Sequence, residues 1–217
     1  WGLAARWKTA RQVGGDFYDL IELPNQRLGL FIADVADKGI PAALFMTLTR
    51  TLVRAAITDT KSPAEALRRV NDLLIPDTQQ GMFVTAVYGV LSLETGLFTY
   101  ANAGHNPPFC LQKKNGEIIR LTRTGMALGV IKGTEMEQRD IQLEENDTLL
   151  FYTDGLTEAF SPQGDLFGEE RLKIALSATS EIPVQKMLDN IEKQLDDFVA
   201  TLPPADDLTM LAVRRQG

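Results

Sequence analysis

The sequence predicts an α+β fold in which two stacked, mainly antiparallel β-sheets are flanked by helices. Three observations support this prediction. Strand patterns come in blocks separated by blocks of helix, and they do not alternate with helices one by one. At least eight strands are predicted within one compact chain, which suggests two sheets packed face to face. The predicted helices are then available to cover the outer faces of these sheets.

Turn and cap signals place the boundaries of the predicted elements. Pro24-Asn25-Gln26 forms the turn of a hairpin, and Pro41 suits the first turn of a helix because its missing N–H costs nothing there. Ser62-Pro63-Ala64-Glu65 is a capping box that begins a second helix. Strands are predicted over residues 2–10, 16–23, 27–35, 83–93, 97–103, 108–112, 117–121, 136–143, 148–153 and 208–213, and helices over residues 41–58, 63–74, 168–178 and 183–199.

The strands after residue 82 are predicted to pair as consecutive hairpins. Their connections are Glu-Thr-Gly at 94–96, the Gly-His-Asn-Pro loop at 104–107 and Lys-Lys-Asn-Gly at 113–116, which are all turn-forming sequences. A further hairpin is predicted through Glu-Glu-Asn-Asp at 144–147. Each strand in this block is therefore expected to lie beside its neighbour in the sequence.

Length and composition predict one domain and exclude several classes of function. The 217 residues are 44% hydrophobic and 24% charged, values that are ordinary for a globular domain. A net charge of -7 argues against a nucleic-acid partner, and the absence of an 18-residue apolar run argues against a membrane span in this segment. The single cysteine, Cys110, is predicted to be a half-buried small apolar residue. The chain, which begins at Trp1, is expected to be part of something longer.

Five aspartates stand beside predicted strand ends or turns, where antiparallel hairpins can bring them to one rim. Asp16 follows two glycines, Asp34 closes a strand, Asp154 lies in a turn, and Asp206-Asp207 opens the last strand. Clustered carboxylates repel one another and need a cation between them, and oxygen ligands are those that Mg²⁺ and Mn²⁺ prefer. Taken singly, Asp154 is better explained as a turn residue and Asp34 as a solvated strand end, and Asp206-Asp207 could be a pair of loop acids.

The order of several motifs resembles the PPM family of metal-dependent Ser/Thr protein phosphatases, in the bacterial branch of SpoIIE and RsbU. The resemblance covers nearly the whole chain, because independent motifs occur in the family's order. These motifs are VGGDFYD (13–19), ADVADKGIPAALFM (33–46), TAVYGVL (85–91), YANAGHNPP (100–108), TDGLTEA (153–159), LFGEERL (166–172) and DDLTMLAV (206–213).

The resemblance implies an αββα sandwich with a two-metal site at one edge of its sheets. Asp34 would bridge the two metals and the carbonyl of Val35 would be a backbone ligand. Asp16 would serve the metal on that side, and Asp154 and Asp206 would hold the other. The adjoining position would be filled by Asp207, as an alternate ligand or as an acid behind the ligands.

Other positions are less fully determined by the resemblance. Ala36 stands where eukaryotic relatives have a histidine, so the proton donor to the leaving group is open. His105 is a candidate by elimination, with a structural hydrogen-bonding role as the alternative. Arg11 is a candidate to bind the substrate phosphate, because guanidinium can bind two oxygens, and a plain surface role is the alternative. Asp19 is expected to be structural.

The resemblance further implies hydrolysis of phosphoserine or phosphothreonine on a partner protein by a water that two Mn²⁺ or Mg²⁺ ions activate. In this branch the substrate is a phosphorylated STAS-domain protein, an anti-anti-sigma factor of stress-response signalling. The domain normally follows a sensory or response-regulator module, so the chain would be the C-terminal part of a longer cytoplasmic protein, and homodimerisation is common. The loop Phe160–Gly168 is predicted to flank the site and select the substrate.

Two other functions fit part of the pattern. A pseudophosphatase would keep the fold and bind its partner without turnover, and a Ca²⁺- or Mg²⁺-stabilised adaptor domain would use the same acids for stability alone. An EF-hand and a P-loop kinase are disfavoured, because the chain has neither a D-x-D-x-D-G loop nor a G-x-x-x-x-G-K-[ST] loop.

Overall fold

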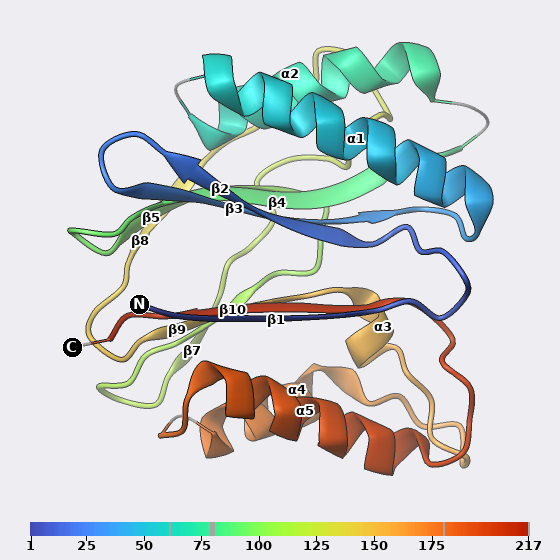
Figure 1. Ribbon diagram of the computed structural model, residues 1–217, viewed down its shortest axis with the longest axis vertical. Helices are drawn as coiled ribbons and strands as arrows, with labels where there is room; N and C mark the ends of the chain where they lie inside the picture. Colours follow the sequence, from blue (N-terminus) through green and yellow to red (C-terminus); the bar gives the residue numbers. More distant parts are fainter. Residues whose placement is uncertain (61, 79–80, 180, 217) are drawn as a thin grey trace. The chain divides into compact units, whose positions relative to one another are not determined.

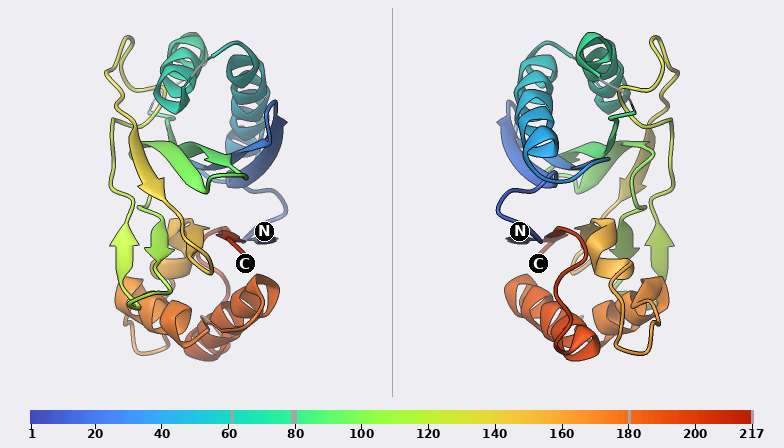
Figure 2. Two further views of the ribbon diagram at one scale, coloured as in Figure 1. Left: turned by 90° about the vertical axis from the view of Figure 1, so that its left-hand side faces the viewer. Right: turned by 90° about the vertical axis from the view of Figure 1, so that its right-hand side faces the viewer.

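The computed structural model of the protein describes residues 1–60, 62–78, 81–179 and 181–216. The chain forms two compact units. The central unit comprises Val13–Pro107 and Thr122–Gln142, and the terminal unit comprises Trp1–Gln12, Pro108–Leu121 and Leu143–Gly217. Each unit contains one five-stranded antiparallel sheet with helices against one of its faces (Figures 1 and 2). The predicted α+β class, with two antiparallel sheets flanked by helices, is confirmed.

The sheet of the central unit has the strand order β2-β3-β4-β5-β8. Strands β2 and β3 form the predicted hairpin, and Asn25 and Gln26 adopt positive φ angles of 61° and 52° at its turn. Two consecutive residues of this kind match the right-handed twist of the flanking strands. The strands of this unit are β2 (Phe17–Leu23), β3 (Arg27–Val35), β4 (Val84–Ser92), β5 (Leu97–Ala103) and β8 (Arg139–Gln142).

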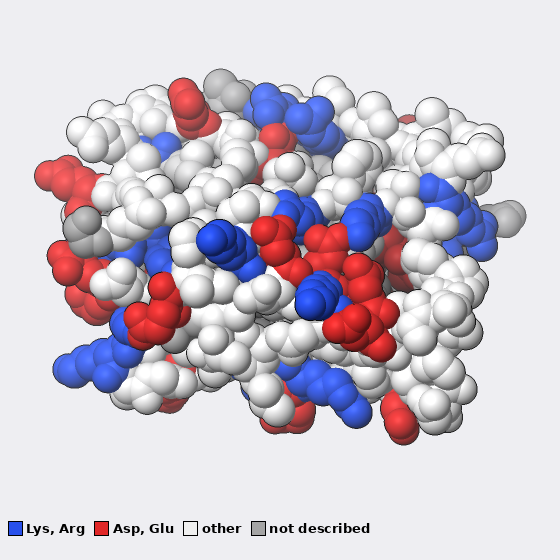
Figure 3. Space-filling model, turned by 60° about the horizontal axis from the view of Figure 1, so that its bottom comes forward, with Lys and Arg blue, Asp and Glu red and all other residues white. Residues whose placement is uncertain are grey.

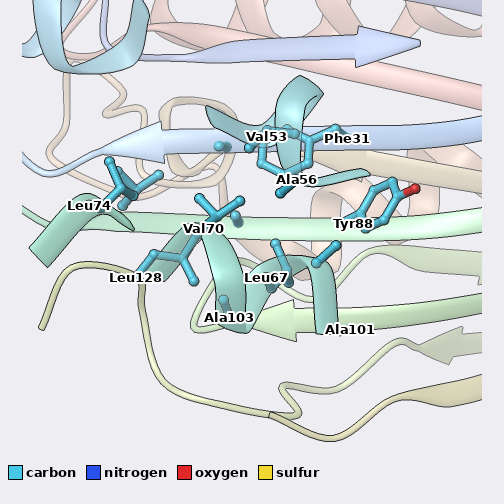
Figure 4. Packing of buried hydrophobic residues seen from close by; sticks show 14 of the residues in the cluster. Phe31, Val53, Ala56, Leu67, Val70, Leu74, Tyr88, Ala101, Ala103 and Leu128 are labelled. Atoms are coloured by element: carbon cyan, nitrogen blue, oxygen red, sulfur yellow. The ribbon is translucent and has the colours of Figure 1, made fainter. Parts of the chain in front are cut away.

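Two helices, α1 (Ile40–Asp59) and α2 (Pro63–Leu74), cover one face of this sheet, and the 3₁₀ turn η1 (Ile75–Asp77) follows them. The predicted cap is present, because Ser62 Oγ accepts the Glu65 N–H at 3.3 Å. Buried side chains of α2 such as Leu67 and Val70 pack with residues of the sheet such as Tyr88 (Figure 4). Burial of this apolar face is what holds the helices on the sheet.

Helix α1 is the one described helix that is long and apolar enough to cross a membrane by length and composition alone. Its segment Ile40–Ile57 has a mean hydropathy of 1.3, and 33% of that segment is buried. Phe45, Val53 and Ala56 nevertheless belong to the core cluster of the central unit. The apolar character of α1 is therefore explained by its packing on the sheet.

The terminal unit has the strand order β1-β10-β9-β6-β7, with β1 at the edge as predicted. Its elements are β1 (Gly2–Lys8), β6 (Phe109–Leu111), β7 (Ile118–Arg120), β9 (Thr148–Tyr152), α3 (Asp154–Thr157), α4 (Gly168–Ala178), α5 (Val184–Val199) and β10 (Leu208–Arg214). Ion pairs of Arg6 and Lys8 with Glu192 join β1 to α5. On the face drawn in Figure 3, acidic and basic side chains lie intermingled.

Two of the predicted hairpins are wrong, because the chain changes sheets at both connections. Strand β5 pairs with β8, whereas β6 pairs with β9. At the first connection, 104–108, two prolines lack the N–H that a ladder needs, and His105 N donates to Asn102 Oδ1. At the second, the buried carboxylate of Asp147 accepts the N–H groups of Lys113 and Glu144, which ties this loop to the terminal unit.

Cys110 lies in β6 as a small apolar residue and is fully buried, more deeply than the half-buried position predicted from the sequence. Burial raises the pKa of its thiol to about 12, and the charge of Asp147 acts in the same direction. A thiol in this state is protonated at neutral pH and is a poor nucleophile. Cys110 therefore acts as a small apolar core residue.

Candidate metal centre

The central unit places Asp16 and Asp34 at the same end of the β2–β3 hairpin. The last pair of the ladder is Phe17 with Ala33, so Asp16 and Asp34 stand one position beyond it on the two chains. Asp16 is 2% exposed and Asp34 is half-buried. Neighbouring carboxylates repel each other and a cation between them offsets this repulsion, so this pair is a suitable position for a cation.

The glycine before Asp16 allows a close approach to the carbonyl of Val35. A Cβ atom on Gly15 would lie 3.2 Å from Val35 O and 3.4 Å from the Cβ of Ala42. The Val35 carbonyl accepts the Asp37 N–H at 2.8 Å, and a carbonyl oxygen has two lone pairs, so one acceptor direction remains for another partner. The glycine motif and the predicted backbone ligand are therefore packed against each other.

This half of the predicted centre fits a hard divalent cation. Its donors are the carboxylates of Asp16 and Asp34 and the carbonyl of Val35, all of them oxygen atoms. Mg²⁺ and Mn²⁺ prefer such donors, whereas thiolates and imidazoles favour softer metals.

His105 has the structural hydrogen-bonding role that was one of its two predicted alternatives. It is 1% exposed, and its Nδ1 lies 2.8 Å from Thr85 Oγ1. Thr85 is the cross-strand partner of Asp34 in the β3–β4 ladder, so the two side chains project from the same face of the sheet. His105 is therefore connected to the Asp34 position through Thr85.

The terminal unit places Asp154 and Asp206 close together through a pair of hydrogen bonds. Asp154 follows β9 and begins the short helix α3, and Asp206 lies just before β10. Between them, Thr153 N donates to Thr209 O and Thr209 N donates to Thr153 Oγ1, both at 3.0 Å. This exchange holds the end of β9 against the start of β10.

Gly155, which has no side chain, allows the turn after Asp154 to pack closely against the backbone of Asp206 and Asp207. A Cβ atom at this position would lie 1.9 Å from Asp207 O, which is closer than any side chain tolerates, and 3.3 Å from Asp206 C. The turn after Asp154 therefore packs directly on the backbone of Asp206 and Asp207. This role of Gly155 was not predicted, because its only signal in the sequence is its place after an aspartate in the TDG motif.

Asp207 is 7% exposed and is used in a backbone contact. Its Oδ1 accepts the N–H of Ala10 at 2.8 Å, and Asp206 Oδ1 accepts the N–H of Asp207 at 2.9 Å. The contact with Ala10 ties the end of the first strand segment to the start of the last strand. Arg11, which is exposed, is the residue directly after Ala10.

The predicted ligands are divided between the two units, with Asp16, Asp34 and Val35 in one and Asp154, Asp206 and Asp207 in the other. Over residues 1–60, 62–78, 81–179 and 181–216, no three His, Cys, Asp or Glu side chains form a metal-binding group. The structure therefore describes two partial sets of oxygen donors, one on each unit. Their joint coordination of metal ions stays a prediction.

The expected structural role of Asp19 is confirmed. Its carboxylate, 5% exposed for the residue, binds Arg54 of α1 through Nε at 2.5 Å and Nη2 at 2.7 Å, and the Nε of Arg50 lies 3.4 Å away. Burial by itself would raise the pKa of Asp19, but the bonds and charges of these two arginines outweigh it and hold the pKa below its usual value. Asp19 therefore connects β2 to α1.

We expect Asp19→Asn to destabilise the fold by about 1–3 kcal/mol at pH 7, because Arg54 loses a charged partner. The lowered pKa means that the ionised carboxylate stabilises the folded state above its unfolded pKa of about 3.9. This contribution is lost as the pH falls through the lower, folded pKa. Thermal unfolding at a series of pH values should show the mutant and the wild type converging in acid.

The matched control for this prediction is Glu22→Gln, which changes charge at an exposed position of the same strand. Its melting temperature should stay close to that of the wild type at every pH. An equal loss of stability in both variants would contradict the assigned role of Asp19.

The loop Phe160–Gly168, which is predicted to select the substrate, is held by local hydrogen bonds. Phe160 and Leu166 form an isolated antiparallel bridge, and Ser161 Oγ accepts the N–H groups of Gln163 and Asp165. Phe167 is buried, whereas the side chains of Phe160 and Leu166 are 50% and 47% exposed. The loop thus presents two apolar side chains on an ordered backbone.

Comparisons with known proteins agree with the motifs. The family model of Stage II sporulation protein E (SpoIIE) matches residues 24–216. The chain is 33% identical to Protein IcfG of Synechocystis sp., over 99% of this chain and 38% of that protein. It is 29% identical to Phosphoserine phosphatase RsbU of Bacillus subtilis, over 95% of this chain and 61% of that protein. The chain therefore spans less than two thirds of the length of either relative.

A solved structure agrees with the fold. The SiaA-PP2C domain of Pseudomonas aeruginosa superimposes with a TM-score of 0.86 and 23% sequence identity, over 98% of this chain and 85% of that domain. At this identity the likeness concerns the fold alone. The family match over residues 24–216 and the likeness to RsbU show that the chain belongs to the SpoIIE family, in the SpoIIE/RsbU branch of the PPM phosphatases.

Proposed function

We propose that the chain is a metal-dependent phosphatase domain that hydrolyses phosphoserine or phosphothreonine on a partner protein. The observation that carries the proposal is the local construction of the two partial donor sets. Gly15 packs on the Val35 carbonyl beside Asp34, and Gly155 packs on the backbone of Asp206 and Asp207. The name of the relative from Bacillus subtilis, a phosphoserine phosphatase, supports the same reaction class.

Each protein group has a defined task in this proposal. Asp34, with Asp16 and the Val35 carbonyl, would hold one cation and share in the other, and Asp154 and Asp206 would hold the second. Two such cations, when bound, lower the pKa of a water molecule and offset the charge of the phosphoryl oxygens. Asp207 would orient the backbone beside Asp206, and Arg11 would bind a phosphate oxygen through its guanidinium.

The proposed substrate is a phosphorylated STAS-domain protein, in line with the branch to which the chain belongs. The chain covers 61% of the length of the RsbU relative. We propose that it is a single catalytic domain at the C-terminal end of a longer cytoplasmic protein, with a sensory or response-regulator module before it. Homodimerisation through that module belongs to the same proposal.

The test is hydrolysis of para-nitrophenyl phosphate and of a phosphoserine STAS-domain protein with Mn²⁺, with Mg²⁺ or with EDTA. We expect turnover with either metal and a loss of at least about a hundredfold in EDTA, because oxygen donors alone supply no Lewis acid. Phosphate release that is unchanged by EDTA would overturn the proposed metal dependence.

The same assay separates the proposal from its two rivals. A pseudophosphatase would bind the phosphoprotein without releasing phosphate under any metal. A metal-stabilised adaptor domain would show a higher melting temperature with Mn²⁺ and no turnover. Turnover with either metal would exclude both.

A further inference from the structure

A pocket of about 300 Å³ opens in the terminal unit between the end of α5, the segment before β10 and the loop after α3. Its wall is largely apolar and includes Phe160, Val199, Leu202 and Pro203. Phe160 and Leu202 are 50% and 40% exposed and line the same pocket, and exposed apolar side chains that gather at one place mark binding sites. The volume is at the lower end for ligand pockets and suits one large side chain.

The pocket shares its wall with the candidate metal centre. Asp206, a predicted ligand, and Gly155, which packs on the backbone of Asp206 and Asp207, both line it. A polypeptide whose phosphoserine is held by the cation that Asp206 would bind must continue past this point. An extended chain advances about 3.3 Å per residue, so residues within about three positions of the phosphoserine can reach the pocket.

The charges at the rim favour a neutral occupant. Asp196, the acid of the lining that is not a predicted metal ligand, would repel an acidic side chain. The lining residue Lys8 is paired with Glu192, and this hydrogen bond, followed by the charge of Glu192, raises the pKa of Lys8 above its usual value. Lys8 therefore already forms an ion pair with an acidic residue of the protein itself.

We infer that this pocket binds an apolar side chain of the substrate protein that lies within about three residues of the phosphoserine. The inference rests on the proposed function, because it uses the position of Asp206 in the metal centre. It adds a preference for leucine-like residues, determined by Phe160 and Leu202, to the recognition of the phosphate.

The experiment uses phosphoserine peptides that differ at one position, with leucine, glycine or glutamate placed in turn at each of the three positions on either side. Both kcat/KM with Mn²⁺ and the Kd of fluorescein-labelled peptides are measured. We expect at least one position where leucine improves both values about tenfold over glycine, because burial of one leucine side chain is worth this much. Glutamate at that position should bind no better than glycine.

Two variants test the pocket directly. Leu202→Ala and Phe160→Ala should each reduce the leucine-over-glycine ratio to about threefold or less, because each removes part of the apolar wall. Ile174→Ala is the matched control, since Ile174 is 68% exposed on α4 and lies outside the pocket lining. The ratio should be unchanged in this control.

A failure of the pocket proposal can be distinguished from a failure of the proposed function. Equal kcat/KM and Kd values for all peptides, or a leucine preference that survives both variants, would overturn the pocket proposal while leaving the phosphatase intact. Absence of turnover with any metal would overturn the proposed function. In that case a leucine preference in Kd that is lost in the two variants would still support the pocket as a binding site.

Discussion

Asp34→Asn is expected to lower phosphatase turnover by about a thousandfold or more while the protein stays folded. Asp34 stands at the end of β3 beside Asp16 and the Val35 carbonyl, and in the proposed centre it is the ligand that both cations share. Asparagine keeps the shape of the side chain and removes its charge. Loss of one preorganised electrostatic group typically costs about 10²–10³ in rate, and loss of a shared ligand weakens two metal sites together.

The measurement is the rate of para-nitrophenyl phosphate hydrolysis over a range of Mn²⁺ concentrations, together with metal-free thermal unfolding. Asp77→Asn is the control, because it makes the same charge change at an exposed position of the central unit. The control should keep the wild-type rate. A folded Asp34→Asn protein with the wild-type rate would remove Asp34 from the proposed centre.

Local signals predicted the individual elements well, because such signals act within a few residues. The β2–β3 hairpin and the cap of α2 at Ser62 follow from turn and cap residues that contact their own neighbours. The short helix α3 was not predicted, since four residues are too few to show a helical period. Periodicity is thus a reliable guide only for elements of several turns or alternations.

Strand pairing was predicted less well because it depends on contacts between distant residues. The sequence between β5 and β6 has ordinary turn chemistry, yet β5 pairs with β8 and β6 with β9. The bond between Asp147 and the Lys113 N–H, which helps to hold the second crossing loop, joins residues 34 positions apart. No local pattern contains such information.

The candidate site shows the same contrast between what a local motif predicts and what contacts between distant residues determine. Its acids were predicted from their motifs, but the groups that position them were not. Thr153 and Thr209 are 56 positions apart, and Ala10 and Asp207 are 197 positions apart, so neither contact has a signal within one motif. The resemblance to a family supplied the predicted ligands, and the structure shows how the backbone beside them is held.

Gly155→Ala is expected to disrupt the part of the proposed metal centre that lies in the terminal unit, although it changes no charged group. Its new methyl group would lie 1.9 Å from Asp207 O, so the backbone after Asp154 or that of Asp206 and Asp207 must move by about 1 Å or more to restore normal van der Waals contact. A displacement of this size at a catalytic centre can cost about a hundredfold in rate. The overpacking should also cost about 1–3 kcal/mol of stability.

The matched control is Gly116→Ala, in the β6–β7 turn of the same unit. Gly116 has a φ of 71°, and no atom lies within 4 Å of the place that a methyl group would take, so alanine there meets strain in the left-handed region without a clash. It should lose about 1–2 kcal/mol of stability and keep its rate. If both variants lose stability alike and both keep wild-type turnover, the contact of Gly155 with Asp207 does not position the catalytic acids. A hundredfold loss of rate in Gly155→Ala alone would show that turnover depends on how the turn after Asp154 packs against the backbone of Asp206 and Asp207.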